Sequence, residues 1–274
     1  MTAIRAAFHV HSEWSYDAEI PLPEIAELFR TRNCDAVFMC EHDRGFDAER
    51  FGAYVEACRE ASVPDGPLLV PGIEYASPDD RVHVPVWGPV PFLGEGVPTT
   101  ELLRAVDAHG GAAVLAHPVR RDAWLVFEPE WLALSAGIEI WTRKWDGWAP
   151  NPRACRMAAE AGLVGVGALD LHRAHQLFPL TMELQVENAP QGALDGPPER
   201  LFEHRQEGPL ENPLTAEACV EALRQGRCRA MIGERPVAPL TRGGLGATAI
   251  AVERVRRPVW RQGRRLRERK QARR

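Results

Sequence analysis

The sequence predicts a single α/β domain in which strands and helices alternate and close into a barrel. The chain has 274 residues and is 45% hydrophobic, which is enough for one large domain of barrel size. Seven apolar segments have the character of buried strands, and helical patterns separate most of them. Polar residues recur directly after these segments, at the strand ends where the sites of α/β barrels lie.

The first half of the chain alternates between short apolar segments and amphipathic patterns. Four segments are expected to be strands: residues 6–8, 36–40, 68–73 and 82–87. Three segments place apolar side chains at helical spacing: residues 23–32, 47–61 and 99–109. The last of these helices opens on a threonine followed by an acidic residue and closes on Gly110-Gly111, which are ordinary helix boundary signals.

The second half repeats the alternation before the pattern changes. Three more strands are expected, at residues 112–116, 138–141 and 164–169, and two helices, at residues 129–135 and 152–161. Repeated βα units favour a parallel sheet, and seven or eight of them favour a closed barrel. Three segments follow: a possible strand at 181–187, a Gly- and Pro-rich excursion at 187–212 and an amphipathic helix at 216–225.

We predict one domain over residues 1–240, followed by a Gly-rich linker and basic tail over residues 241–274. Residues 254–274 carry eleven basic residues and one acidic residue, a net charge of +10. The remaining 22 basic and 37 acidic residues leave −15 for the rest of the chain. Such a tail is either a solvated terminus or a docking segment for nucleic acid or an anionic membrane surface.

Composition favours a cytoplasmic protein. No run of about 18 apolar residues is present, so no membrane span is predicted, and no apolar signal region precedes the first histidines. The six cysteines lack CxxC pairs and disulfide-framework spacing, which favours buried free thiols. The sequence does not indicate an oligomeric state.

Histidines and carboxylates gather where the predicted strands end. Five strand ends carry such a residue: His9, His42, Glu74, His117 and Asp170. His11 stands two residues after His9, so strand alternation points both rings to one side, and Asp17 follows closely enough to fold back over them. Imidazole and carboxylate donors together suit a divalent metal.

These motifs resemble the polymerase and histidinol phosphatase (PHP) superfamily of metal-dependent phosphoesterases. The resemblance rests on six motifs in the family's order: His9-Val10-His11-Ser12, Glu41-His42-Asp43, Gly72-Ile73-Glu74, the lone His83, Ala116-His117-Pro118 and Asp170-Leu171-His172. It covers roughly residues 6–175. The fold that it implies is a distorted seven-stranded, TIM-like (β/α)7 barrel, in agreement with the strand count.

The resemblance implies two or three divalent ions, such as Mn, Zn or Fe, and assigns nine ligands. One ion would be held by His9, His11, Glu74 and Asp170. A second would share Glu74 and add His83 and His117, and a third would take Asp17, His42 and His172. The chain departs from the family where Glu41 replaces a common aspartate, and where Tyr16-Asp17-Ala18 replaces a common Asp-Gly.

The function that follows is hydrolysis of a phosphate ester in a small phosphorylated metabolite or nucleotide. Metal coordination would lower the pKa of water to about 7 and supply hydroxide as the nucleophile. Glu74 would act as the bridging catalytic carboxylate, and Asp43 would orient a ligand or protonate the leaving group. Six further residues are candidates for substrate binding: Arg44, Arg120, Arg121, Lys144, Arg173 and His175.

Two alternatives stay open. A nuclease or phosphodiesterase acting on nucleic-acid ends would use the same metals and the basic tail as an anchor, although a nucleic-acid partner is not favoured. The second alternative is a non-catalytic metal-binding regulatory module descended from such an enzyme. A degenerate copy of the enzyme would be expected to lose ligands, so the complete ligand set argues against it.

Overall fold

The computed structural model describes residues 1–63, 65–187, 214–237 and 251. The strands in this part of the chain are β1 (Thr2–Val10), β2 (Ala36–Met39), β3 (Glu41–His42), β4 (Leu68–Val70), β5 (Gly72–Ala76), β6 (His83–Trp87), β7 (Ala112–Leu115), β8 (Gly137–Thr142), β9 (Val164–Ala168), β10 (Leu180–Val186), β11 (Cys228–Ile232) and β12 (Arg235–Pro236). The predicted excursion at 187–212, apart from its first residue, and the Gly-rich linker and basic tail, apart from residue 251, lie outside the described residues.

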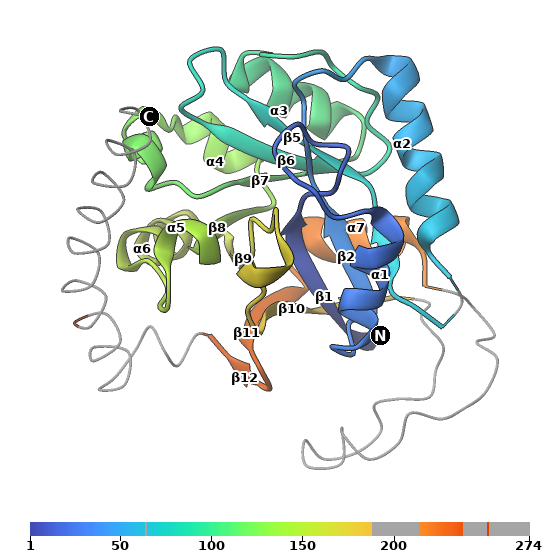
Figure 1. Ribbon diagram of the computed structural model, residues 1–274. Helices are drawn as coiled ribbons and strands as arrows, with labels where there is room; N and C mark the ends of the chain where they lie inside the picture. Colours follow the sequence, from blue (N-terminus) through green and yellow to red (C-terminus); the bar gives the residue numbers. More distant parts are fainter. Residues whose placement is uncertain (64, 188–213, 238–250, 252–274) are drawn as a thin grey trace, which may run out of the picture.

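Helices flank the strands on several sides. They are α1 (Leu22–Arg30), α2 (Ala48–Ala61), α3 (Thr99–Ala108), α4 (Pro129–Leu134), α5 (Arg143–Asp146), α6 (Pro152–Ala161) and α7 (Ala216–Arg224), with short 3-10 turns η1 (Arg120–Val126) and η2 (Ala174–Gln176). Figure 1 shows α2 along one flank of the strands and α5 with α6 along the opposite flank. None of the described helices is long and apolar enough to cross a membrane.

The strands form two six-stranded sheets, ordered β12-β11-β10-β1-β2-β4 and β3-β5-β6-β7-β8-β9. Only Cys40 separates β2 from β3, and only Pro71 separates β4 from β5, so each run passes from the first sheet into the second. Residues 68–73, expected as one strand interrupted by Pro71 and Gly72, are therefore the whole of β4 and the start of β5. Pro71 has no N–H to donate to a ladder, which is consistent with a break at that position.

The fold is mixed α/β rather than all-parallel, which corrects the expectation of a parallel sheet. β6 runs antiparallel to both β5 and β7. The connection from β5 to β6 is too short for a crossover, so β6 must run back along β5. The possible strand at 181–187 is β10, and it pairs antiparallel with β1. Pairing within the described residues leaves both sheets open, with an isolated bridge between Val10 and Leu171, so the closed seven-stranded ring stays a prediction.

The apolar core lies between the strands and the helices and contains Phe8, Phe38 and Trp87. The rings of Phe8 and Phe38 stack 3.9 Å apart, and Trp87 packs edge-on against both. The Trp87 indole N–H donates to the carbonyl of Met39, which ties β6 to the end of β2. All six cysteines are free, as expected, although Cys155 and Cys228 are only partly buried.

Candidate metal centre

Glu74 on β5 lies at the centre of the polar cluster and is almost fully buried. Its Oε1 atom faces three rings: His83 Nδ1 at 2.9 Å, His117 Nε2 at 3.0 Å and His9 Nε2 at 3.3 Å. Its Oε2 atom faces two more: His42 Nδ1 at 3.1 Å and His11 Nε2 at 3.6 Å. Histidines that are as much as 108 positions apart in the chain thus surround one carboxylate. β1, β3 and β7 end at this place, and the antiparallel β6 begins there with His83.

His9 and His11 reach this place through a bulge in β1. β1 pairs in register with β2 up to Phe8, and the register then shifts so that Val10 opposes Met39. His9 is the extra residue, with φ at 62° in the left-handed region. The two rings lie 5.0 Å apart, so the expectation that they share one side is met by a bulge rather than by simple alternation.

Two other strand ends carry the same unusual backbone. His117 follows β7 with φ at 26°, and Asp170 follows β9 with φ at 51°. Backbone of this kind costs non-glycine residues of order 1–3 kcal/mol each and concentrates at functional sites. The surrounding fold therefore compensates for strain at three of the predicted ligands.

Four groups of three side chains within the described residues bring potential donor atoms within 4.8 Å of one another. They are His9, His11 and Glu74; His9, His117 and Asp170; Glu74, His83 and His117; and His11, His42 and His172. The first lies within the set predicted for one ion, and the third equals the set predicted for a second ion. Asp170 joins the first group through Oδ1, which lies 3.5 Å from His11 Nε2.

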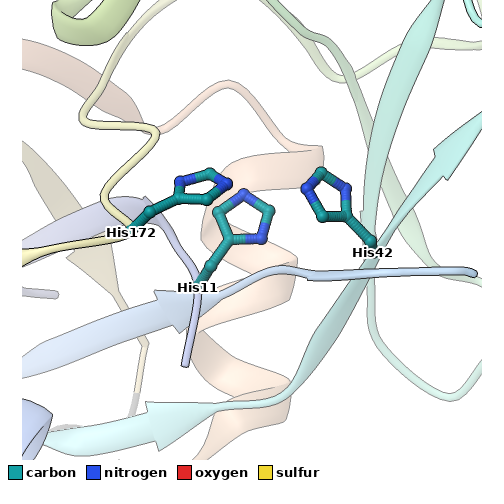
Figure 2. A group of neighbouring side chains, drawn as sticks. All are labelled: His11, His42 and His172. Atoms are coloured by element: carbon teal, nitrogen blue, oxygen red, sulfur yellow. The ribbon is translucent and has the colours of Figure 1, made fainter. Parts of the chain in front are cut away.

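The fourth group differs from the predicted third set by including His11. Figure 2 shows the His11, His42 and His172 rings turned toward a common space from three separate segments. Asp17, the ligand expected there, lies at its edge: Oδ1 is 3.3 Å from His42 Nε2, and Oδ2 is 3.1 Å from His172 Nε2. The structure therefore brings all nine predicted ligands together.

Comparison with known proteins gives structural matches only, since no family model and no curated protein matches the sequence. The chain superposes on a two-domain protein from Bacteroides vulgatus that contains a predicted PHP-like metal-dependent phosphoesterase, with a TM-score of 0.55 and 18% identity over 86% of this chain and 66% of that one. The chain has a PHP-like fold. It also superposes on PsfC from Pseudomonas syringae, with a TM-score of 0.59 and 14% identity over 95% of this chain and 100% of that one.

The carboxylates at the centre of this PHP-like fold are held ionised. Burial opposes ionisation of Glu74, but His9, His83, His117 and His42 together hold its pKa well below the usual range. Burial likewise opposes ionisation of Asp170, whose pKa is held well below the usual range mainly by the Lys144 ammonium. The cluster therefore offers negative charge to a cation.

The histidines divide into two classes. Burial favours the neutral form of His9, His11 and His42, but carboxylates outweigh it at His9, where Glu74, Glu139 and Asp170 raise the pKa well above 6.5. Asp17 and Glu74 similarly raise the pKa of His42 to about 10, against the effect of burial. At His11, by contrast, burial and the neighbouring His172 and His42 hold the pKa well below 6.5.

Three buried ring nitrogens have no hydrogen-bond partner: His9 Nε2, His11 Nε2 and His117 Nδ1. Buried polar atoms without partners are uncommon and costly in proteins. His9 Nε2 and His11 Nε2 both lie beside Glu74 and Asp170. Neutral imidazole nitrogens and carboxylate oxygens are the donors that Zn, Mn and Fe accept, so the residues present fit a divalent metal.

Two of the predicted substrate-binding arginines are engaged elsewhere. Arg120 and Arg121 both form ion pairs with Asp80, and the Asp80 Oδ1 atom lies 2.6 Å from His83 Nε2. Arg120 Nη1 also lies 3.1 Å from the same His83 nitrogen. These arginines therefore neutralise the aspartate that contacts a candidate ligand.

Lys144 on α5 is the predicted substrate-binding residue that lies among the candidate ligands. Its Nζ atom donates to Asp170 Oδ1 at 3.1 Å and lies 3.3 Å from His172 Nε2. The adjacent Trp145 donates from its indole N–H to the other carboxylate oxygen, Oδ2, at 2.6 Å. Asp170 is thus oriented from both sides by one short helix.

The remaining predicted residues lie farther out. Arg44 stacks over the exposed ring of Tyr16, and Arg173 pairs with Glu19 at the surface. His175 is exposed on η2, and no hydrogen bond or ion pair is recorded for it within the described ranges. Asp43 accepts hydrogen bonds from the backbone N–H groups of Ala76 and Gly96, so it anchors a loop rather than a histidine.

Sequence reasoning missed Glu139 and Ser15. Glu139 is buried on β8, where its Oε1 atom lies 2.6 Å from His9 Nδ1. Ser15 Oγ lies 3.2 Å from His11 Nδ1 and 2.5 Å from an oxygen of the buried Glu41. The one sequence signal that could have revealed Glu139 was a glutamate inside the apolar run 138–141. No sequence signal marks Ser15.

Proposed function

We propose that this chain is a metal-dependent phosphoesterase acting on a small phosphorylated metabolite or nucleotide. The observation that carries the proposal is the buried Glu74 carboxylate with five histidines around it. Such a donor-rich cluster at strand ends is typical of a catalytic metal site in an α/β fold. The PHP-like fold supports the same reaction class.

We assign the candidate ligands as two or three ion sites. One is His9, His11, Glu74 and Asp170; the second is Glu74, His83 and His117; the third is Asp17, His42 and His172, with His11 close by. Bound divalent ions supply two things to phosphate-ester hydrolysis: they acidify water, and they neutralise charge on phosphoryl oxygens. Mn, Zn and Fe all suit this mixture of imidazole and carboxylate.

The protein's own residues have distinct tasks in this proposal. Glu74 reaches two ligand sets at once through its two oxygens, which makes it the bridging carboxylate. Lys144, whose side chain is 28% exposed, is the cation placed to meet a phosphoryl group. Asp43, whose pKa burial raises, is buried beside His42 and is the candidate proton donor to a leaving group.

The proposal includes a closed seven-stranded barrel. Its support is the bridge between Val10 and Leu171, with hydrogen bonds from the N–H groups of Leu169 and Leu171 to the carbonyls of Phe8 and His9. These contacts join the end of β9 to β1, which are the last and the first strands of the series from β1 to β9. Closure of this kind would bring the first and last motifs of the chain into one site.

The experiment is a panel of phosphomonoesters, phosphodiesters and labelled oligonucleotides assayed with chelated protein after reloading with Mn²⁺, Zn²⁺ or Fe²⁺. Turnover of small esters that Asp170→Asn abolishes, and that Glu56→Gln on exposed α2 leaves intact, would support the proposal. Activity restricted to oligonucleotide ends would favour a nuclease instead. Full metal loading without turnover on any substrate would contradict the enzyme and leave a metal-binding module.

A further inference from the structure

Two buried carboxylates outside the candidate ligand set act on the outer nitrogens of His9 and His11. We infer that Glu139, directly, and Glu41, through Ser15, are positioning groups that hold a proton on Nδ1 of these rings and so present both Nε2 atoms to a divalent cation. The inference rests on the proposed metal centre but not on the reaction carried out there.

The hydrogen bonds of Glu139 determine which nitrogen of His9 carries the proton. Its Oε2 atom accepts from the backbone N–H of His117 at 2.8 Å and from the Thr142 hydroxyl at 2.5 Å. An ionised carboxylate only accepts, so His9 Nδ1, at 2.6 Å from Oε1, is the donor. An imidazole that binds a metal ion carries only one N–H. With that proton held on Nδ1 by Glu139, the lone pair for the ion would be on Nε2, which has no hydrogen-bond partner.

The hydrogen bonds of the Ser15 hydroxyl determine in the same way which nitrogen of His11 carries the proton. A hydroxyl carries one proton, and Ser15 donates it to Glu41 Oε2 at 2.5 Å. Ser15 Oγ also accepts from the backbone N–H of His42 at 3.1 Å. Toward His11 Nδ1, at 3.2 Å, the Ser15 oxygen can then only accept a hydrogen bond, so Nδ1 carries the ring proton. The lone pair for a metal ion is then on His11 Nε2, which has no hydrogen-bond partner.

Glu139 also couples ligands from two strands. Through one carboxylate on β8 it holds the ring of His9 in the bulge of β1 and the backbone of His117 after β7. Both residues have positive φ, so both need support from outside their own strand. Outer hydrogen bonds that orient metal-binding histidines typically change metal affinity about 10- to 100-fold when removed.

The first test reads the tautomers directly. Protein labelled with 15N-histidine and loaded with Zn²⁺ is examined by long-range 1H–15N correlation, with signals assigned by their loss in His9→Asn and His11→Asn. We expect protonated Nδ1 and metal-bound Nε2 for both rings. A proton on Nε2, or metal on Nδ1, in either ring overturns the inference.

The second test measures Zn²⁺ affinity by competition with a chromophoric chelator. Glu139→Gln places an amide N–H₂ against His9 Nδ1, which moves the ring proton to Nε2, and Ser15→Ala removes the acceptor of His11. We expect each variant to lose affinity about 10- to 100-fold. The matched controls are Asp146→Asn and Ser135→Ala: both positions are buried, and their recorded hydrogen bonds reach no histidine within the described residues.

Unchanged affinity in Glu139→Gln and Ser15→Ala overturns the inference, and so does an equal loss in the two controls. The histidine spectrum comes from the unaltered protein and Ser15→Ala removes one hydroxyl, so a folding failure of Glu139→Gln leaves the question decidable. If the unaltered protein shows the expected tautomers but hydrolyses no phosphoester, the proposed function fails while this inference stands.

Discussion

Among single residues, Lys144 combines two opposing effects. Its ammonium donates to Asp170 at 3.1 Å, where a metal ion would also be attracted, so it competes with the ion for that carboxylate. The same positive charge favours a phosphoryl group in the site. The side chain is partly exposed, which moderates both effects.

Lys144→Met should therefore tighten metal binding while weakening catalysis. We expect kcat/KM on a phosphomonoester to fall about 10- to 100-fold, the equivalent of one hydrogen bond to a charged group, and Zn²⁺ affinity to rise. Steady-state kinetics and chelator competition measure the two. Arg104→Gln, which removes a surface ion pair with Glu130, is the control. A loss of both activity and metal affinity would contradict this role for Lys144.

At the scale of the element, β5 depends on a glycine two residues before Glu74. A Cβ atom added at Gly72 would lie 2.2 Å from Trp87 Cδ1 and 2.7 Å from the Met39 carbonyl oxygen. The indole that fills this space ties β6 to β2, so it cannot move away cheaply. The close approach of backbone and indole thus accounts for glycine at this position of the motif.

Gly72→Ala should lower the free energy of unfolding by about 1–3 kcal/mol, the usual cost of overpacking a core. Gly52→Ala should have the opposite effect on stability, because Gly52 lies inside α2 and a Cβ there meets nothing within 4 Å. That variant should gain about 0.5–1 kcal/mol from helix propensity. Chemical denaturation compares the pair, and equal stabilities would show that the Gly72 contact relaxes without cost.

For the whole molecule, metal binding should join the two sheets. The candidate ligands come from β1 in the first sheet and from β3, β5 and β6 in the second, so an ion would cross-link them. Chelation should lower Tm, because a ligand at 100 times its Kd adds about 2.7 kcal/mol of stability. Calorimetry with and without excess Zn²⁺ measures the difference.

The difference in stability between the Zn²⁺-bound and metal-free protein should increase as pH rises from 6 to 9. Asp17 and Glu74 raise the pKa of His42 to about 10 against the effect of burial, so in the metal-free protein this ring is protonated and a metal must displace the proton. In that protein His42 contributes stability that is complete below its unfolded pKa of about 6.5 and is lost as pH rises toward 10. Both statements describe the same His42 proton, which the metal displaces, and a stability difference that does not change with pH would contradict them.

The alternation of apolar and helical segments predicted most elements, but not how the strands pair. The all-parallel expectation was wrong at β6, because apolar pattern reports burial and not direction. The substrate-binding residues were less predictable than the ligands. Arg120 follows the candidate ligand His117 by three positions, and Lys144 follows the strand residue Trp141 by three. Arg120 nevertheless pairs with Asp80 and Lys144 with Asp170, since their directions depend on the turn that carries each.

The sequence by itself determined which donors are present and that most of them stand near strand ends, because strand ends of an α/β fold converge on one face. Glu74 lies within β5 and His83 begins β6. Only the tertiary structure decided that Nε2 of both His9 and His11 lies beside Glu74. His9 and Glu139 are 130 positions apart and lie on strands of different sheets, β1 and β8. The spacing of residues along the chain predicts which side chains share a face or a strand end, whereas a hydrogen bond between two sheets depends on how the sheets pack, which residue order does not specify.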